Sequence, residues 1–269
     1  MKNRGIKKAR QNNTWSAFIL ITAGLGTLIL LSAFSVTQGA SDISFSTIAD
    51  ALLRFDSLDR SHLVIVDLRF PRVIASVLVG AALAVAGAVM QGITRNPLAD
   101  SGLLGLNAGA GFALSISFAF FPSLTYLETV LFCFMGAALG AALVMGVSSL
   151  RRGGATPMRL VLAGAAVGAL LTALSQGIAL CFEVSRDIMF WTVGGVSASN
   201  WEQITVMAPF ILAALAGALV LSRQISLVSL GEEVARGLGA NTRLVNSLCS
   251  LIVVALAGVS VSIVGAVGF

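Results

Sequence analysis

Long apolar segments without charge alternate along the chain with short polar segments that carry its charged residues. A helix of about 20 residues crosses the roughly 30 Å hydrocarbon layer of a bilayer, and each apolar segment reaches that length. The pattern therefore predicts an all-α, polytopic transmembrane helical bundle with seven spans. The predicted spans are Trp15–Val36, Val73–Thr94, Gly102–Phe121, Thr129–Leu150, Leu160–Phe182, Gln203–Ser222 and Leu244–Phe269.

The composition excludes a soluble domain, because 57% of residues are hydrophobic and 11% are charged, against about 25% charged in globular proteins. The net charge of +5 does not indicate nucleic-acid binding, because no basic stripe interleaved with aromatic residues follows the amino terminus. Five bases precede the first span and are typical of a cytoplasmic anchor. They are Lys2, Arg4, Lys7, Lys8 and Arg10.

Loop charges predict the orientation of the spans, since Lys and Arg gather on the cytoplasmic side. This rule places the amino terminus and the loops 95–101, 151–159 and 223–243 inside. The stretch between the first two spans is net acidic until Arg69 and Arg72, so it belongs outside. A multi-pass protein of the bacterial cytoplasmic membrane, with its amino terminus in the cytoplasm, is expected.

Small residues predict close packing of helices, because lipid gives no hydrophobic drive for association and contacts depend on backbone approach. Gly136 and Gly140 share one predicted span, and Gly164 and Gly168 share another. We interpret both pairs as contacts within the bundle rather than as a dimer motif. No Pro-rich or Ser-rich linker divides the sequence, so a single domain over residues 1–269 is expected.

Few residues could bind a metal or a cofactor. Cys133, Cys181 and Cys249 each lie in an apolar run without CxxC spacing, and His62 is the only histidine. We expect inert core thiols, no resident metal and no cofactor.

An amphipathic pattern occurs after the sixth span. Leu230, Val234, Ala235 and Leu238 form an apolar stripe at helical spacing, and Gly239 is a candidate C-cap. The segment therefore predicts a short cytoplasmic helix. The stripe fits either a helix that lies on the membrane surface or a helix that docks on a partner.

A polar strip lies on the fifth predicted span, where Thr172, Ser175 and Gln176 stand at positions i, i+3 and i+4. Such a strip fits interhelical hydrogen bonds or the lining of a pathway. Two charged groups, Arg69 and Arg72, stand at the outer end of the second span, where arginines commonly reach lipid phosphates.

No predicted span contains Asp, Glu, Lys, Arg or His, although ion-coupled carriers usually need such a group. The chain also lacks a Walker A pattern and any Ser/His/Asp or paired-carboxylate arrangement. We therefore expect no enzyme activity in this chain and an energy source on a separate subunit. A secondary carrier and a non-transporting membrane protein are the alternatives from other classes.

Residues 68–111 read LRFPRVIASVLVGAALAVAGAVMQGITRNPLADSGLLGLNAGAG. This segment resembles the FecCD family of ABC-transporter permeases, which import iron–siderophore chelates, haem and vitamin B12, and the likeness extends over nearly the whole chain. The resemblance implies the fold of the vitamin B12 transporter permease, with about ten spans against the seven predicted here.

The resemblance also assigns candidate sites. The sequence LGEEVARGLG resembles the segment that couples such permeases to their ATPase, which implies that role for Leu230, Gly231, Glu232, Glu233, Ala235 and Gly239. Arg69 and Arg72 correspond to arginines that pair with glutamates of the substrate-binding protein. The fifth span borders the pathway in the family, with Thr172, Ser175 and Gln176 on it, and Gly194 and Gly195 resemble the turn near its mouth.

These observations predict the permease subunit of a binding-protein-dependent ABC importer, with iron(III)–siderophore complexes as the expected substrate on family frequency alone. Haem and cobalamin are the alternatives. The expected partners are a second permease subunit, identical or related, a cytoplasmic ABC ATPase and an extracytoplasmic substrate-binding protein.

The closing residues, Val264–Phe269, match the beginning of a family segment that continues as a Gly-rich turn and further helices. We expect a permease that is truncated at its carboxyl end and does not support transport alone.

Overall fold

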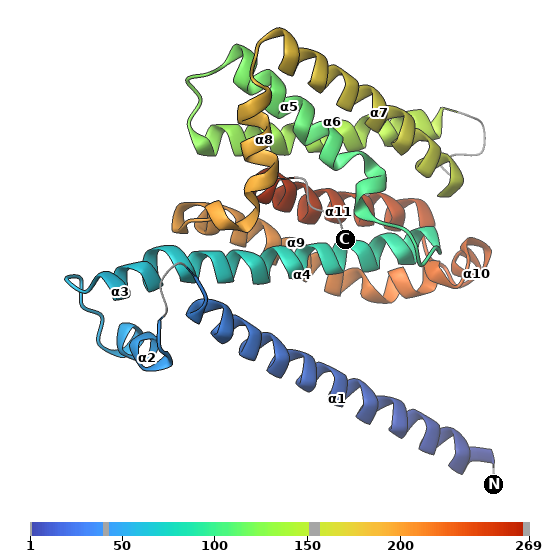
Figure 1. The fold of residues 1–269 in the computed structure, drawn as a ribbon. Coiled ribbons are helices and arrows are strands. Elements are labelled where there is room, and N and C mark those ends of the chain that lie inside the picture. Colours follow the sequence, from blue (N-terminus) through green and yellow to red (C-terminus); the bar gives the residue numbers. More distant parts are fainter. Residues whose placement is uncertain (1, 40–42, 151–156, 266–269) are drawn as a thin grey trace. The chain divides into compact units, whose positions relative to one another are not determined.

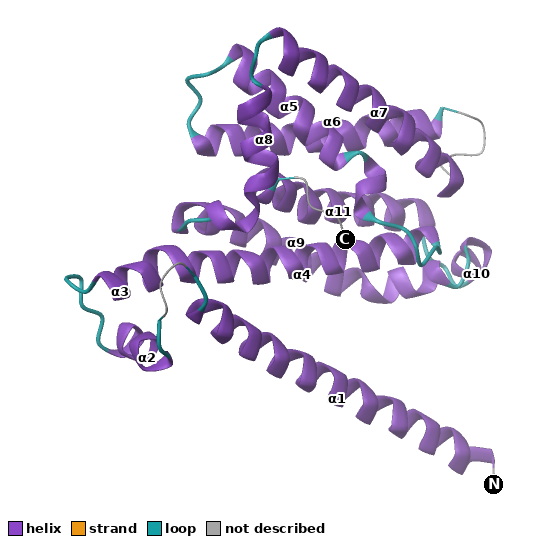
Figure 2. Ribbon diagram, viewed as in Figure 1, coloured by secondary structure: helices purple, strands orange, loops and turns teal. Residues whose placement is uncertain are grey.

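The computed structural model describes residues 2–39, 43–150 and 157–265, with side chains from Trp15 onward except at positions 157 and 194. The described ranges are helical and contain no strand (Figure 2). The elements are α1 (Lys2–Thr37), α2 (Phe45–Leu53), α3 (Arg60–Leu63), a π-helix (Val64–Arg69), α4 (Phe70–Thr94), a 3₁₀ turn (Ser101–Leu104), α5 (Leu106–Phe120), α6 (Tyr126–Ser149), α7 (Pro157–Cys181), α8 (Ser185–Gly194), a second 3₁₀ turn (Gly195–Ala198), α9 (Trp201–Ser229), α10 (Glu232–Gly237) and α11 (Thr242–Val264).

Six helices in the described residues are long and apolar enough to cross a membrane, which confirms the predicted class of fold. They are Trp15–Thr37, Arg60–Thr94, Tyr126–Ser149, Met158–Cys181, Trp201–Ser229 and Thr242–Val264.

The third predicted span, Gly102–Phe121, is shorter than expected. Its start forms a 3₁₀ turn, Gly105 adopts a left-handed conformation with φ of 70°, and the helix α5 has only 15 residues. At 1.5 Å per residue α5 is about 22 Å long. The predicted span was therefore too long. The apolar sequence continues across the turn at Gly105, but the helix begins only after that turn.

Contacts divide the chain into two compact units, residues 1–73 and residues 74–269. The single domain over residues 1–269 stays a prediction. The basic side chains at positions 2–10, the loop residues 151–156 and the chain end at 266–269 lie outside the described residues or side chains, so the expectations about them are not addressed by the fold.

The first unit packs a small apolar cluster around the carboxyl end of α1. Val36, Ile43, Ala51 and Ile65 are its buried members. Ser44 begins α2 by accepting the Thr47 N–H. The polar stretch that the sequence analysis placed outside thus contains two short helices and a π-helix.

Two hydrogen bonds fix the loop between α2 and α3. The Nδ1 atom of His62, a buried side chain, accepts the Asp56 N–H at 3.0 Å. Asp59 caps α3 by accepting the Ser61 N–H at 2.7 Å, and this hydrogen bond lowers the pKa of the Asp59 carboxyl below its usual value. This segment is therefore stabilised mainly by local polar caps and not by a large hydrophobic core.

The second unit is built around α5. Figure 1 shows α5 beside α6 and α7, and α11 contacts both α6 and α9. The larger of its two core clusters includes Met90 of α4, Leu114 of α5, Met207 of α9 and Leu256 of α11. Because these side chains come from helices far apart in sequence, the cluster holds the bundle together.

Glycines allow α5 to approach α6 and α7 closely. A Cβ on Gly140 would lie 2.6 Å from the Gly105 carbonyl oxygen, and a Cβ on Gly136 would lie 2.5 Å from the Gly109 carbonyl oxygen. A Cβ on Gly164 would collide with the Leu103 carbonyl oxygen. The predicted role in close packing is confirmed for Gly136, Gly140 and Gly164, but not for Gly168, where a Cβ would meet only the Ala108 Cβ at 4.0 Å.

Candidate functional site

The segment between α9 and α11 contains the helix that the amphipathic pattern predicts. The loop expected over 223–243 is largely helical, since α9 continues to Ser229 and α10 spans Glu232–Gly237. Gly231 separates the two helices with φ of 126°, a value that L side chains rarely adopt. Gly239, with φ of 83°, follows the end of α10 and donates its N–H to the Arg236 carbonyl. The two glycines therefore set both ends of α10.

The apolar stripe of α10 divides between the bundle and the surface. Ala235 is fully buried in the core cluster. Leu230, Val234 and Leu238 are 66%, 50% and 62% exposed. We call these three side chains the α10 apolar surface. Val234 lies on α10, whereas Leu230 and Leu238 lie just before and just after it. Exposed aliphatic side chains grouped in this way are typical of a docking site.

Charged residues of α10 form a network with the first residue of α11. Arg236 Nη2 donates to Glu232 Oε1 at 2.6 Å. Arg236 Nε donates to Thr242 Oγ1 at 3.3 Å, and Thr242 Oγ1 donates to Glu232 Oε1 at 3.3 Å. Glu233 is exposed beside this network. The network joins the predicted coupling segment to α11.

Arg69 and Arg72, which were predicted to face outward, occupy different environments. Arg69 is only 7% exposed, and its Nη1 atom donates to the carbonyls of Val36 at 2.6 Å and Thr37 at 3.0 Å. These are among the last carbonyls of α1, which have no partner within the helix. Arg72 is exposed. The structure therefore places only Arg72 at the surface, contrary to the expected pair of outward arginines, and docking through Arg72 stays a prediction.

A hollow of about 430 Å³ lies beside these arginines, within the first unit. Ser35, Gln38, Arg69 and Arg72 contribute its polar lining, and Val64 lies on its apolar side. The hollow gives Arg72 room to meet a partner side chain.

The polar strip of α7 is divided as well. Ser175 Oγ donates to the Gly111 carbonyl of α5 at 3.1 Å, which is the interhelical bond that one interpretation of the strip predicted. Thr172 and Gln176 are exposed. Gly194 ends α8 and Gly195, with φ of 53°, begins the following turn. A pathway role for any of these residues stays a prediction.

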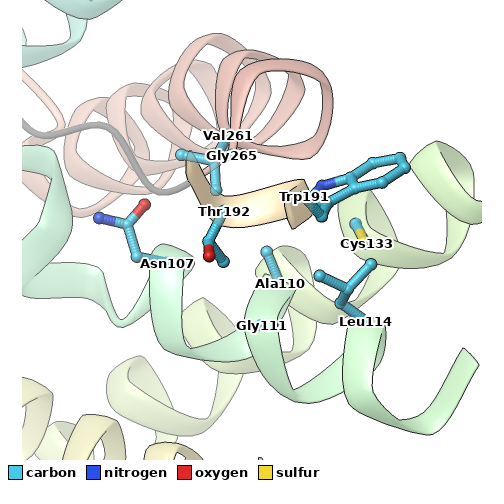
Figure 3. Close-up of a pocket in the computed structure, with 9 residues that line it drawn as sticks. All are labelled: Asn107, Ala110, Gly111, Leu114, Cys133, Trp191, Thr192, Val261 and Gly265. Atoms are coloured by element: carbon cyan, nitrogen blue, oxygen red, sulfur yellow. The ribbon is translucent and has the colours of Figure 1, made fainter. Parts of the chain in front are cut away.

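A small cavity lies where α5, α6, α8 and α11 meet (Figure 3). Its volume is about 20 Å³, which is enough for about one water molecule. Asn107 and Thr192 supply polar side chains, and Trp191 forms part of the wall. The cavity is too small for a metal chelate, and none of the predicted pathway residues lines it.

Trp191 also fastens α8 to neighbouring helices. Its ring stacks on Tyr126 with centroids 4.8 Å apart, and the Tyr126 hydroxyl donates to the Ile263 carbonyl at 3.3 Å. Gly265 lies against the Trp191 and Thr192 carbonyls, where a Cβ would approach to about 3 Å. The carboxyl end of α11 is thus packed against α8.

A groove of about 520 Å³ lies between α4 and α9 in the second unit. Small and aliphatic side chains line most of it, and Ser222 and Ser226 are its polar members. This groove contains no charged residue.

The cysteines differ in exposure. Cys133 and Cys249 are buried, as expected, but Cys181 is exposed. The expectation of a core thiol was wrong for Cys181 because it is the last residue of α7, beyond the packed part of the helix. Among the described residues, no group of three His, Cys, Asp or Glu side chains could hold a metal ion.

Arg236 and Thr242 were missed by the sequence analysis. Arg236 stands four residues after Glu232, a spacing that favours an ion pair on a helix. Asn241 and Thr242 precede an apolar run, which is a helix start signal. The first pattern could have identified the ion pair, and the second the start of α11, but neither predicts the contact between Thr242 and α10.

The bundle and its exposed amphipathic helix define a multi-pass helical membrane protein with a surface suited to a partner. A family model described as the FecCD transport family matches residues 27–269. The chain therefore belongs to the FecCD transport family, as the sequence resemblance indicated.

Relatives and a solved structure agree with this assignment. The Iron(3+)-hydroxamate import system permease protein FhuB of Bacillus subtilis (strain 168) is 44% identical over 96% of this chain and 67% of its own length. The Fe(3+)-citrate import system permease protein YfmD of the same organism is 40% identical over 94% of this chain and 73% of its own length. An inward-facing metal-chelate type ABC transporter superposes with a TM-score of 0.77 at 27% identity, over 92% of this chain and 77% of the other.

Proposed function

We propose that the chain is a permease subunit of a binding-protein-dependent ABC importer that carries iron(III) chelates across the bacterial cytoplasmic membrane. Membership of the FecCD transport family and the similarity to hydroxamate and citrate permeases support this function. The observation that carries the mechanism is the α10 apolar surface, exposed between two helices of the bundle.

The α10 apolar surface is suited to a protein partner. Leu230, Val234 and Leu238 present aliphatic groups, and Glu232 and Glu233 add acidic groups at the start of the helix. An apolar centre with a polar rim is the usual composition of a protein interface. The proposed partner is the cytoplasmic ABC ATPase, since the chain has no Walker A pattern of its own.

The first unit supplies the proposed contact with the substrate-binding protein. Arg72 is exposed at the end predicted to face outward. Its planar guanidinium can hold a carboxylate with two parallel hydrogen bonds. A second permease subunit, identical or related, completes the proposed assembly by covering Thr172 and Gln176 on the exposed side of α7.

A substitution on α10 tests this function. We expect Val234→Glu to abolish co-purification of the ATPase and uptake of iron chelate, because it places a charge in the centre of the apolar surface. The same substitution at Leu98 is the matched control, since Leu98 is 87% exposed in another loop predicted to be cytoplasmic. If Val234→Glu retains both the ATPase and uptake, α10 is not the coupling surface.

The substrate class needs a separate test. We expect uptake of labelled ferric hydroxamate to exceed uptake of labelled haem or cobalamin in a strain that lacks its own permeases. Dominant uptake of cobalamin or haem would instead assign this chain to one of the alternative substrates. Transport that continues without any ABC ATPase would assign it to the secondary carriers.

A further inference from the structure

The attachment of α10 to its two neighbouring helices differs in kind. At the α9 side, the connection is a backbone turn: the Gly231 N–H donates to the Val228 carbonyl at 3.1 Å, and no side chain caps α10. At the α11 side, the Gly239 and Ala240 N–H groups also form a backbone turn, and side chains add a second connection through Glu232, Arg236 and Thr242. In Figure 1, α10 lies at the end of α9 and α11.

The hydroxyl of Thr242 closes this side-chain connection. A hydroxyl donates one hydrogen bond and accepts two. The Thr242 hydroxyl donates to Glu232 and accepts from Arg236, and the same two side chains bond each other. Each of the three residues therefore contacts the other two.

The three residues of this network differ in how deeply they are buried. Glu232 and Arg236 are 49% and 60% exposed, so water screens their ion pair and it contributes little alone. Thr242 is only 3% exposed. Its hydroxyl is thus the buried anchor that fixes two exposed side chains of α10 to the first turn of α11.

The first turn of α11 is itself held firmly. Asn241 Oδ1 caps α11 by accepting the Leu244 N–H at 3.2 Å, and the Val245 N–H donates to the Asn241 carbonyl at 3.0 Å. The apolar part of α11 is 67% buried, the highest share among the six long helices of the described chain. A displacement of this turn therefore acts on the core of the bundle.

We infer that Thr242 is a positioning residue that ties α10 to α11, so that a displacement of α10 is transmitted to α11. This inference rests on the proposed function, in which α10 is the surface that the ATPase moves. Thr242 acts through Glu232 and Arg236 and contacts no partner itself.

Hydrogen exchange in detergent micelles tests the tie without any transport assay. We expect Thr242→Val, which keeps the shape and removes the hydroxyl, to speed amide exchange at residues 232–240 about tenfold. Thr242→Ser keeps the hydroxyl and should stay within about twofold of the parent protein. Thr94→Val is the matched control, because Thr94 is a buried threonine whose hydroxyl bonds only the Met90 carbonyl of its own helix.

A second variant guards against misfolding of Thr242→Val. Arg236 is largely exposed, so Arg236→Lys keeps the charge and the fold but loses the guanidinium fork that reaches both Glu232 and Thr242. We expect it to speed the same exchange several-fold. Exchange that is unchanged in both Thr242→Val and Arg236→Lys would overturn the inference.

Coupling is then measured in the complex with the ATPase. We expect Thr242→Val to keep the ATPase bound and to reduce the ratio of uptake to ATP hydrolysed about tenfold. Thr242→Ser should have the same ratio as the parent protein. If Thr242→Val speeds amide exchange but leaves the ratio of uptake to ATP hydrolysed unchanged, transmission through Thr242 is overturned. Failure of the proposed function gives a different result. If α10 is not the ATPase surface, Val234→Glu retains the ATPase. The hydrogen-exchange measurement still decides whether Thr242 ties α10 to α11.

Discussion

Gly164 and Gly177 lie on the same helix, α7, in opposite surroundings. A Cβ on Gly164 would collide with the Leu103 carbonyl oxygen, whereas a Cβ on Gly177 would meet no atom within 4 Å. We expect Gly164→Ala to lower the free energy of unfolding by about 1–3 kcal/mol through overpacking. Gly177→Ala should be neutral or stabilising by up to about 1 kcal/mol, because alanine favours the helix. Thermal unfolding in detergent compares the two, and equal losses would contradict the packing argument.

Substitutions of Arg69 and Arg72 are expected to have different effects, the first on stability and the second on docking. Arg69→Gln removes charge-assisted hydrogen bonds to the Val36 and Thr37 carbonyls, so it should cost about 1.5–3 kcal/mol and speed amide exchange at the end of α1. Arg72→Gln should leave that exchange unchanged, because its side chain is exposed. Exchange measured at residues 34–39 tests the difference, and a parallel effect of both substitutions would refute it.

Docking itself is tested at Arg72. We expect Arg72→Glu to weaken binding of the substrate-binding protein by about 2 kcal/mol if the pair is desolvated, since it replaces an attraction by a repulsion. Binding to the reconstituted importer gives the affinity. An unchanged affinity would mean that Arg72 takes no part in docking.

Sequence patterns predicted residues that act through a local rule and missed those that depend on tertiary contacts. Gly239 was predicted as the end of α10 because glycine is the usual residue there. The burial of Arg69 was not predicted, since its position beside Arg72 in the sequence says nothing about the carbonyls of α1. Thr242 was missed for the same reason, because its partners lie on another helix.

At the scale of elements, the contact between α8 and α11 depends on Gly265. This residue has φ of 85° and lies against the Trp191 and Thr192 carbonyls. We expect Gly265→Ala to displace α8, because alanine costs about 1–3 kcal/mol at a positive φ with ψ of −165° and its Cβ has no space. The displacement should alter Trp191 fluorescence in a Trp15→Phe, Trp201→Phe background.

The matched control for this displacement is Gly111→Ala. Gly111 lines the same small cavity, but a Cβ there would meet no atom within 4 Å. We expect its Trp191 emission to match the parent protein. An identical emission spectrum for Gly265→Ala would mean that α8 does not rest on the end of α11.

Apolar runs predicted the existence of the long helices well and their boundaries less well. The predicted span Gln203–Ser222 is part of a helix that continues to Ser229, because polar residues such as Arg223 and Gln224 do not end a helix beyond the membrane. Gly105 ends the run before α5 by its backbone conformation alone. The amphipathic pattern located α10 within two residues, since both of its ends are set by glycine.

At the scale of the whole molecule, the exposed Cys181 offers a test of orientation. The charge rule places the carboxyl end of α7 outside, and Cys133 and Cys249 are buried. We expect a membrane-impermeant maleimide to label Cys181 in intact cells. In a Cys181→Ser background, Glu233→Cys should be labelled only after permeabilisation, and the reverse pattern would invert the predicted topology.

The helix α5 is covered along nearly its whole length, with Phe120 as its only exposed residue. A lipid-facing helix of about 22 Å would suffer hydrophobic mismatch in a bilayer of about 30 Å. Because α6, α7, α8 and α11 surround α5, the ends of this short helix meet protein instead of acyl chains. Changes in bilayer thickness should therefore tilt the outer helices of the bundle, while the register of α5 against its neighbours stays constant.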